Sequence, residues 1–250
     1  MKPLIVLKLG GELLEQQPDL ARVATGIAAL ATAGIPKRQV DGLRVTDART
    51  LDVVVAVLAG AINTRLVAAV RRAGAKPVGL TGADAAVATV KRSAPIVSVA
   101  GETVDLGLVG APVSNGRPQL LVDLLKGGYV PVIACIGATR GGQLMNVNAD
   151  TLASHLAGAL GASRLIIAGG TSGVLDAAGA TITRLKARDA RKLITAGTAN
   201  KGMVAKLQAC TAALKHGVGD VLITNGRSVT FDALSTTRTA PADTTQVVMR

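Results

Sequence analysis

Short apolar runs alternate along this chain with segments in which apolar residues recur at helical spacing. The first run, residues 4–11, contains Lys8 and ends on Gly10 and Gly11. A continuous run of this length is typical of a strand that is covered on both faces in a parallel sheet. The same pattern predicts further strands at residues 77–80, 129–136, 164–168, 221–224 and 247–249.

Helices are predicted between these strands. Leu20, Val23, Ile27 and Leu30 share one face of a first helix that stops at Gly34. A second helix is predicted to begin after a cap at Thr46 or Asp47. Further helices are predicted at residues 63–73, 120–125, 152–160 and 203–215. An irregular segment is predicted at residues 36–44 and a hairpin at residues 96–109. Strands that alternate with helices imply right-handed crossovers and a layered α/β fold.

The composition of the chain indicates which kinds of ligand or macromolecule it can bind. Apolar residues make up 49% of the 250 residues, enough for a sizeable core, and the formal charge of +12 favours anionic partners. The basic residues are scattered in ones and twos, and aromatic residues, at 1%, are too few to stack on bases. Nucleic acid is therefore not expected, and small anionic ligands or a solvated basic surface explain the charge.

The two cysteines, Cys135 and Cys210, lie far apart in apolar surroundings and show neither metal-ligand spacing nor a disulfide framework. A reducing cytoplasm is the expected location, and no metal held by the protein's own side chains is expected. We also expect no signal peptide and no apolar run long enough to span a membrane.

Lys8 in the first run indicates phosphate chemistry. A lysine inside an apolar strand is costly unless its ammonium meets an anion. Glycines at a strand end allow backbone N–H groups to close on a phosphate. The alternative is a lysine whose ammonium reaches solvent beside an ordinary turn.

Residues 146–150 form a second informative cluster. Asn146 and Asn148 point the same way in an extended chain and can offer amide donors and acceptors to one ligand. Asp150 can orient lysine ammoniums or a metal. Capping of the following helix would require only one of these side chains.

Three weaker signals point to the same chemistry. A glycine-rich loop at residues 169–173 follows a predicted strand, as nucleotide-binding loops often do, but it is not a Walker loop. Lys206 is placed in the first turn of a helix, where the helix dipole favours an anion, and Arg44 can bind a carboxylate through two hydrogen bonds. A solvated surface is the alternative for both cations. His155 and His216 are expected to be structural.

Together these segments resemble the amino-acid kinase family, in family order and over nearly the whole chain. Each motif is weak alone, and the combination is specific. The matching motifs lie at residues 8–11, 42–47, 58–60 with Asn63, 78–84, 106–110, 146–150, 172–176 and 202–206.

The resemblance implies a three-layer αβα sandwich with a mainly parallel open sheet, the carbamate-kinase-like fold. It implies a single domain over residues 1–250, with residues 1–160 binding an acylated amino acid and forming a homodimer and residues 161–250 binding ATP. The implied reaction transfers the γ-phosphoryl group of ATP, accompanied by Mg²⁺, to the γ-carboxylate of N-acetyl-L-glutamate, the second step of arginine synthesis. The chain lacks the extra N-terminal helix of arginine-inhibited hexameric members, which implies a dimer insensitive to arginine.

By position, Lys8 and Lys206 would stabilise charge on the transferred phosphoryl group, and Asp150 would hold both lysines in place. This agrees with the need of phosphoryl transfer for positioning and positive charge. The residues implied to bind the acceptor are Gly10, Gly11, Arg44, Asn146 and Asn148, with Gly10 and Gly11 donating backbone N–H groups. Those implied to bind the nucleotide are Gly170, Thr171, Ser172, Gly173, Leu175, Asn200, Lys201, Gly202 and Met203.

The chain departs from the family between its first helix and Arg44. The family has a second strand there, which ends in a His-Gly-Gly-Gly loop, whereas residues 33–35 lead here almost directly into residues 36–41. About 20 residues are missing, enough for a strand, its loop and the start of a helix. We expect uncovered apolar surface at the sheet, and either a substitute for the loop or impaired activity.

Smaller departures concern the nucleotide site. Gly170 and Thr171 stand where the family usually has Asp-Val, and Lys201, in place of Gly or Asp, can add a phosphate contact. Two alternative functions stay open. One is a kinase for aminoadipate or glutamate bound to an acidic carrier protein, which a basic surface would dock. The other is a non-catalytic paralogue that keeps the fold without the glycine loop.

Overall fold

The structure is a computed structural model that describes residues 3–14, 39–40, 43–98, 101–114, 116–197, 199, 201–228, 234 and 241–249. The chain forms two compact units. The first unit contains residues 1–14 and 149–250, and the second contains residues 15–148. The assignment of residues 1–160 to the acceptor and of residues 161–250 to ATP stays a prediction.

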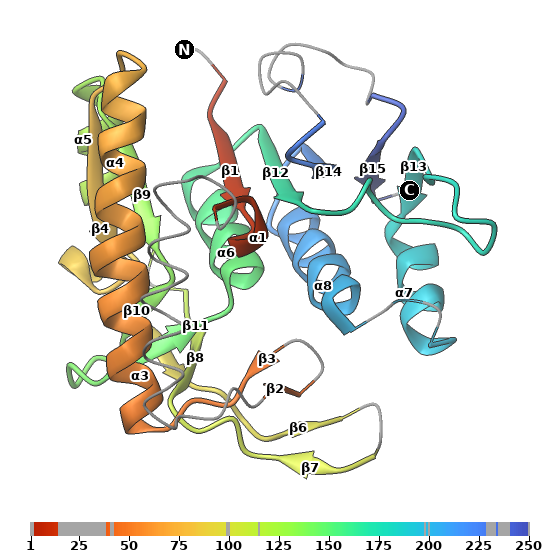
Figure 1. Cartoon of the computed structure of the whole chain (residues 1–250), viewed down its shortest axis with the longest axis horizontal. Coiled ribbons are helices and arrows are strands. Elements are labelled where there is room, and N and C mark those ends of the chain that lie inside the picture. The colour runs from red at the N-terminus through yellow and green to blue at the C-terminus, as the bar shows by residue number, and fades with distance from the viewer. Residues whose placement is uncertain are drawn as a thin grey trace. The chain divides into compact units, whose positions relative to one another are not determined.

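The first unit is built on a five-stranded sheet in the order β1-β12-β14-β15-β13 (Figure 1). The parallel strands β1 (Ile5–Leu9), β12 (Arg164–Gly169) and β14 (Asp220–Asn225) bring their carboxyl ends to one edge. β15 (Thr244–Val248) is antiparallel to β14, and β13 (Arg184–Lys186) is parallel to β15. The sheet is therefore mainly parallel, as the sequence predicts.

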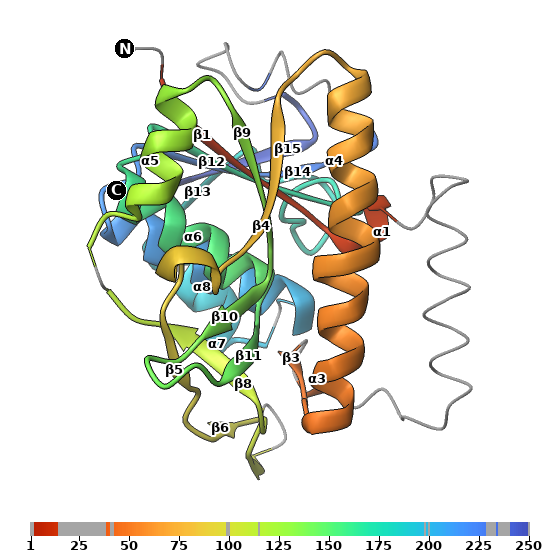
Figure 2. The same cartoon turned by 90° about the vertical axis from the view of Figure 1, so that its left-hand side faces the viewer.

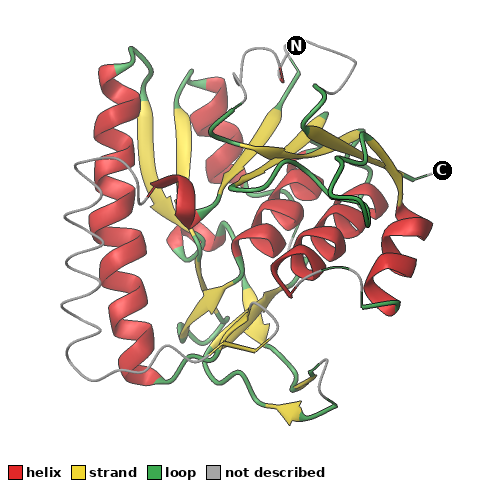
Figure 3. Cartoon of the chain, turned by 45° about the vertical axis from the view of Figure 1, so that its right-hand side comes forward, coloured by secondary structure: helices red, strands yellow, loops and turns green. Residues whose placement is uncertain are grey.

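Helices α6 (Ala149–Leu160), α7 (Ala187–Thr195) and α8 (Lys201–Lys215) cover this sheet, and a short α1 (Gly11–Leu14) follows β1 (Figure 3). The core between sheet and helices consists of aliphatic side chains, because the chain has almost no aromatic residues. Its fully buried members include Leu165, Ile167, Leu207, Val221, Ile223 and Val247.

The second unit contains one long helix, formed by α3 (Ala48–Val54), a π-helical stretch η1 (Val55–Ile62) and α4 (Asn63–Arg72). It runs beside the parallel pair β4 (Pro77–Thr81) and β9 (Val130–Ala134) (Figure 2). The two helices predicted here are therefore a single one. By length and composition alone this helix could cross a membrane, so the expectation that no apolar run is long enough is wrong.

Smaller elements complete the second unit. A four-stranded sheet has the order β10-β11-β8-β5, and two hairpins pair β2 with β3 and β6 with β7. The bounds are β2 Gln39–Val40, β3 Leu43–Arg44, η2 Asp84–Ala86, β5 Val90–Arg92, β6 Ile96–Val97, β7 Thr103–Val104, β8 Val109–Pro112, α5 Gln119–Lys126, β10 Ile136–Ala138 and β11 Leu144–Val147.

Several predicted elements differ in detail. The segment at 36–44, expected to be irregular, contains the β2–β3 hairpin. The strand expected at 129–136 is divided into β9 and β10, and Tyr129 and Val130 are exposed rather than buried. α8 begins at Lys201, so Lys206 lies in its second turn and not in its first.

The predicted first helix and the shortened junction at residues 33–38 lie outside the described residues. Within the described residues, β1 pairs only with β12, which leaves its other edge unpaired. Leu7 on β1 is 42% exposed, although this run was expected to be covered on both faces. Such uncovered apolar surface is what loss of a neighbouring strand produces.

Candidate active site

A buried ion pair joins β1 to α6 in the first unit. The Lys8 Nζ and Asp150 Oδ1 atoms are 2.7 Å apart, and the two side chains are only 10% and 6% exposed. Asp150 is the second residue of α6, and Lys8 lies one residue before the end of β1. The lysine in the apolar run is therefore held by a carboxylate and does not extend into solvent.

Two glycines follow Lys8 at the carboxyl edge of the sheet. The N–H of Gly10 donates to the carbonyl of Ala168 at 2.9 Å and so extends the ladder between β1 and β12. In this structure the Gly10 N–H is used within the sheet, and the predicted contact of Gly10 with a substrate stays a prediction. Gly11 begins α1, where the first N–H groups have no partner within the helix.

Lys206 lies on α8, which packs against α6, the helix that carries Asp150. Cys210, one turn further along α8, is fully buried, and burial together with the nearby Asp150 carboxylate raises the pKa of its thiol, whereas Lys206 lowers that pKa. Asp150 and Lys206 thus act electrostatically on one buried atom. The sequence predicted that Asp150 orders two lysines, and the structure places Lys8 in direct contact with it.

The glycine-rich loop after β12 is hydrogen-bonded to β15. The Val174 N–H donates to the Thr245 hydroxyl at 2.7 Å, and the Thr181 hydroxyl donates to the Ser172 carbonyl at 2.9 Å. Gly173 has a φ of +67° and is buried against Thr245, where a Cβ would not fit. The loop therefore has a defined shape, with Leu175 45% exposed at its end.

Other nucleotide-site residues fall at the start of α8. Gly202 is exposed and Met203 is buried. Asn200 and the side chain of Lys201 lie outside the described part of the chain, so the predicted phosphate contact of Lys201 stays a prediction.

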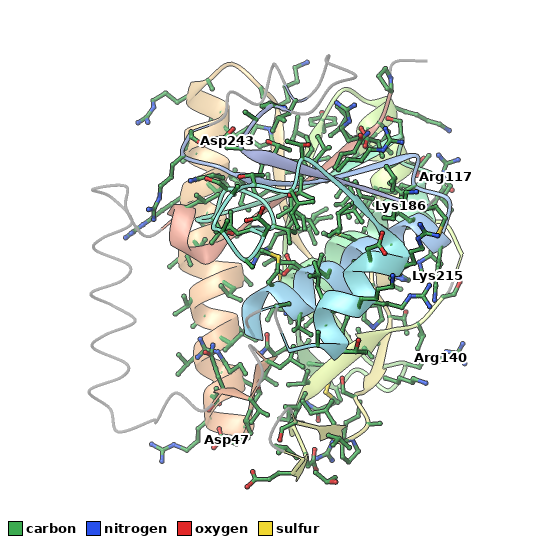
Figure 4. The ribbon with its side chains drawn as sticks, turned by 90° about the vertical axis from the view of Figure 1, so that its right-hand side faces the viewer. Asp47, Arg117, Arg140, Lys186, Lys215 and Asp243 are labelled. Carbon is green, nitrogen blue, oxygen red and sulfur yellow. The ribbon has the colours of Figure 1, made fainter. Side chains whose placement is uncertain are left out.

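In the second unit, Thr46 connects two of the residues predicted to bind the acceptor. The Thr46 hydroxyl donates to the carbonyl of Arg44 at 3.2 Å and accepts from Nδ2 of Asn146 at 3.1 Å. Thr46 is fully buried, whereas Arg44, Asn146 and Asn148 are half-buried. From the sequence, Thr46 was predicted only as one of two possible caps of the next helix. The structure shows that the cap is Asp47, whose carboxylate accepts from the Thr50 N–H at 2.7 Å at the N-terminal end of α3 (Figure 4).

A shallow cavity of about 590 Å³ also lies in the second unit, where α3 and η1 meet the β10–β11 turn. None of the predicted site residues lines it. Its lining residues are Leu51, Asp52, Val55, Ala56, Gly141, Gly142, Gln143 and Leu144. The buried Lys8–Asp150 pair is the stronger candidate site, because burial of a charged pair costs free energy and clusters of this kind are common at functional sites.

The described side chains form no cluster of three or more His, Cys, Asp or Glu residues. They therefore do not fit a metal site built from the protein alone. His155 on α6 has a lowered pKa because it is partly buried and close to His216. The structural role predicted for both histidines stays a prediction.

Comparison with known proteins finds relatives over most of the chain. A family model described as the amino acid kinase family matches residues 30–225. An acetylglutamate kinase of Methanopyrus kandleri is 41% identical over 234 residues, covering 88% of this chain and 94% of the relative. An acetylglutamate kinase of Sorangium cellulosum is 44% identical over 241 residues, covering 86% and 84%.

Solved structures share the fold at low identity. An N-acetylglutamate synthase from Neisseria gonorrhoeae complexed with coenzyme A and N-acetyl-glutamate has a TM-score of 0.77 at 23% identity, covering 99% of this chain and 60% of that chain. Carbamate kinase from Giardia lamblia bound to AMP-PNP has a TM-score of 0.64 at 13% identity, covering 100% and 99%. The predicted carbamate-kinase-like fold is confirmed.

Proposed function

Because the chain belongs to the amino acid kinase family, we propose that it transfers the γ-phosphoryl group of ATP to the γ-carboxylate of N-acetyl-L-glutamate. The product would be N-acetyl-L-glutamyl 5-phosphate, formed in the second step of arginine biosynthesis. The observation that carries the proposal is the buried Lys8–Asp150 pair at the carboxyl end of β1, in a chain 41% identical to an acetylglutamate kinase.

The two lysines supply the charge that the reaction needs. In the transition state, the phosphoryl group that is being transferred carries negative charge on its oxygens. Catalysis depends on positioning of the substrates and on electrostatic stabilisation of that charge. Lys8 would stabilise it from the end of β1 and Lys206 from α8. Asp150 holds the Lys8 ammonium at 2.7 Å, which fixes its position before the substrates bind.

We assign the remaining predicted residues to the two substrates. Arg44, Asn146 and Asn148, with Gly10 and Gly11, would bind the acceptor. The loop from Gly170 to Gly173 would bind the nucleotide together with Leu175, whose exposed side chain offers apolar surface to the base, and residues 200–203. The ordered shape of this loop, set by Thr245 and Thr181, supports the assignment.

We propose that Mg²⁺ accompanies the nucleotide. The described side chains do not fit a metal site of their own, and Mg²⁺ in such enzymes is bound mainly by the phosphates and water. Bound in that way, it would neutralise phosphate charge. No step assigned to Lys8, Lys206 or Asp150 depends on it.

A homodimer is part of the proposal. Only 17% of the most apolar 18 residues of the helix Ala48–Arg72 are buried. An apolar helix surface of this length needs a cover, and a second copy of the chain provides one without a membrane. We also propose a cytoplasmic location. Light scattering tests the dimer, and an Ala56→Glu change on the exposed face of this helix should yield monomers.

The two alternative functions receive no support from the comparisons, since the relatives are named acetylglutamate kinases. A coupled assay of ADP formation decides among the three. Turnover with free N-acetylglutamate supports the proposal, turnover only with a carrier-bound acceptor supports the carrier-dependent kinase, and none with either supports the non-catalytic paralogue. The last outcome would mean that the missing glycine loop has no substitute.

A further inference from the structure

The hydroxyl of Thr46 makes two hydrogen bonds, and its chemistry fixes their direction. One bond runs to the carbonyl oxygen of Arg44, at 3.2 Å. A carbonyl can only accept, so the single hydroxyl proton is used there. In the other bond, with the side-chain amide of Asn146 at 3.1 Å, Thr46 must therefore accept. The NH₂ group of Asn146 has to face Thr46, and its Oδ1 atom has to face away.

The backbones of Thr46 and Asn146 are both hydrogen-bonded to the segment of residues 106–108. The Thr46 N–H donates to the Leu106 carbonyl at 2.9 Å, and the Thr46 carbonyl accepts from the Leu108 N–H at 2.6 Å. The Asn146 N–H donates to the Leu108 carbonyl at 3.0 Å. Gly107 has a φ of +74° and lies so close to the Thr46 carbonyl that no side chain fits there. Thr46 and Asn146 are thus held in register.

We propose that Thr46 is a positioning residue that sets which ligand groups Asn146 can bind. With its NH₂ group held by Thr46, Asn146 presents an acceptor, Oδ1, to the ligand. The ligand group opposite it has to be a donor, and the amide N–H of an N-acylated amino acid is such a group. An ester oxygen in its place would meet Oδ1 as a second acceptor. This inference rests on the proposed function and adds the basis of selection for N-acyl over O-acyl substrates.

A purely structural role for Thr46 makes a different prediction. If the hydroxyl only stabilised the region around β3, its loss would lower the stability of the fold and would weaken the binding of all acceptor substrates equally. A positioning role changes the ratio between ligands that differ at one atom. A site built around a hydrogen bond rejects an analogue that cannot make it, because a buried polar group is left unpaired.

The test measures equilibrium binding of N-acetyl-L-glutamate and of 2-acetoxyglutarate, in which an ester oxygen replaces the N–H group. Calorimetry on the full chain is used, so that no turnover is needed. The intact protein should bind the amide about tenfold or more tightly than the ester, which corresponds to about 1.4 kcal/mol. Thr46→Val keeps the shape, frees the Asn146 amide to rotate, and should reduce the ratio to within about threefold of one. Thr46→Ser should restore it.

Thr50→Val is the matched control. Thr50 is also a buried threonine of the second unit, and its backbone N–H bonds to Asp47 rather than to Asn146. This variant should keep the amide-to-ester ratio of the intact protein. If Thr46→Val fails to fold, Thr46→Ser and the intact protein still test the ratio itself.

Two results overturn the inference: an intact protein that binds the two ligands equally, or a Thr46→Val variant that keeps the full preference. Failure of the proposed function is a separate result. A chain that shows the predicted preference in calorimetry but forms no ADP with N-acetylglutamate retains the positioning role of Thr46 and loses the kinase assignment.

Discussion

The Lys8 ammonium and the Asp150 carboxylate lie 2.7 Å apart between β1 and α6, and each side chain is at least nine-tenths buried. Burial of two charges costs free energy that their attraction only partly returns, so a well-packed apolar pair would be at least as stable. A pair that stability alone does not require is consistent with a catalytic role. It lies at the carboxyl edge of a parallel sheet, where α/β proteins bind ligands.

Replacement of Lys8 alone should damage both stability and activity. Lys8→Met leaves Asp150 buried and unpaired, which should lower the free energy of unfolding by about 3–5 kcal/mol. It should lower kcat by about a hundredfold to a thousandfold, since a preorganised charge is lost. The double change Lys8→Met with Asp150→Leu should regain most of the stability in urea unfolding and none of the activity. A double variant that regains activity would contradict a catalytic role for Lys8.

Asn63 and Gly79 should behave as a coupled pair. The Asn63 amide donates to the carbonyls of Val132 at 2.8 Å and of Leu80 at 3.4 Å, and a Cβ at Gly79 would collide with its oxygen. Gly79→Ala should cost about 1–3 kcal/mol by overpacking, and Asn63→Ala about 1–3 kcal/mol because the carbonyls of the half-buried Leu80 and Val132 lose a hydrogen bond.

In a double-mutant cycle, the two changes together should cost less than their sum, because removal of the amide makes room for the methyl group. Additive costs would show that the collision is relieved elsewhere.

The turn after β4 stores backbone strain. Ala85 has φ 46° and ψ 34°, a left-handed conformation that is unfavourable for any residue with a Cβ, and Asp84 holds the turn by accepting from the Thr81 N–H at 2.6 Å. Ala85→Gly should raise stability by about 0.5–1 kcal/mol in thermal or urea unfolding, after the entropic cost of glycine is subtracted. Ala83→Gly, at φ −75°, is the control and should destabilise. Equal effects of both changes would argue against strain.

Acid should destabilise the fold through His155. Its pKa is lowered by burial and by His216, so the unfolded chain takes up this proton at a higher pH than the folded protein. Stability is therefore complete above the ordinary histidine pKa of about 6.5 and falls as pH drops through it towards the folded value. His155→Gln should flatten the stability curve between about pH 7 and 5. His216→Gln should flatten it less, since burial remains, and an unchanged curve in His155→Gln would refute the assignment.

Features encoded locally were predictable from the sequence. The strand at Lys8 follows from an apolar run that ends on glycines, and the start of α3 follows from Asp47 and the periodicity after it. The mainly parallel sheet follows from alternation of strands and helices. Each depends on residues within a few positions of one another, where pattern and propensity act.

Features that depend on distant partners were not predictable. The hydroxyl of Thr46 meets the Asn146 amide across 100 positions, and nothing near Thr46 in the chain indicates that contact. The sequence predicted two helices here, the second beginning at Asn63, but a π-helical stretch joins them into one helix, and the Asn63 side chain bonds to a strand. Tertiary contacts override local preference at these positions.

Phosphoryl transfer to the acceptor is tested by trapping the acyl phosphate itself. Hydroxylamine converts an acyl phosphate into a hydroxamate that can be quantified. We predict hydroxamate only when the intact protein, ATP and N-acetyl-L-glutamate are all present, and a loss of about a hundredfold or more in Lys8→Ala and in Lys206→Ala. Lys215→Gln, a charge removed from the exposed last residue of α8, should leave the yield unchanged. No hydroxamate from the intact protein, or an equal yield from Lys8→Ala and Lys206→Ala, would contradict the account.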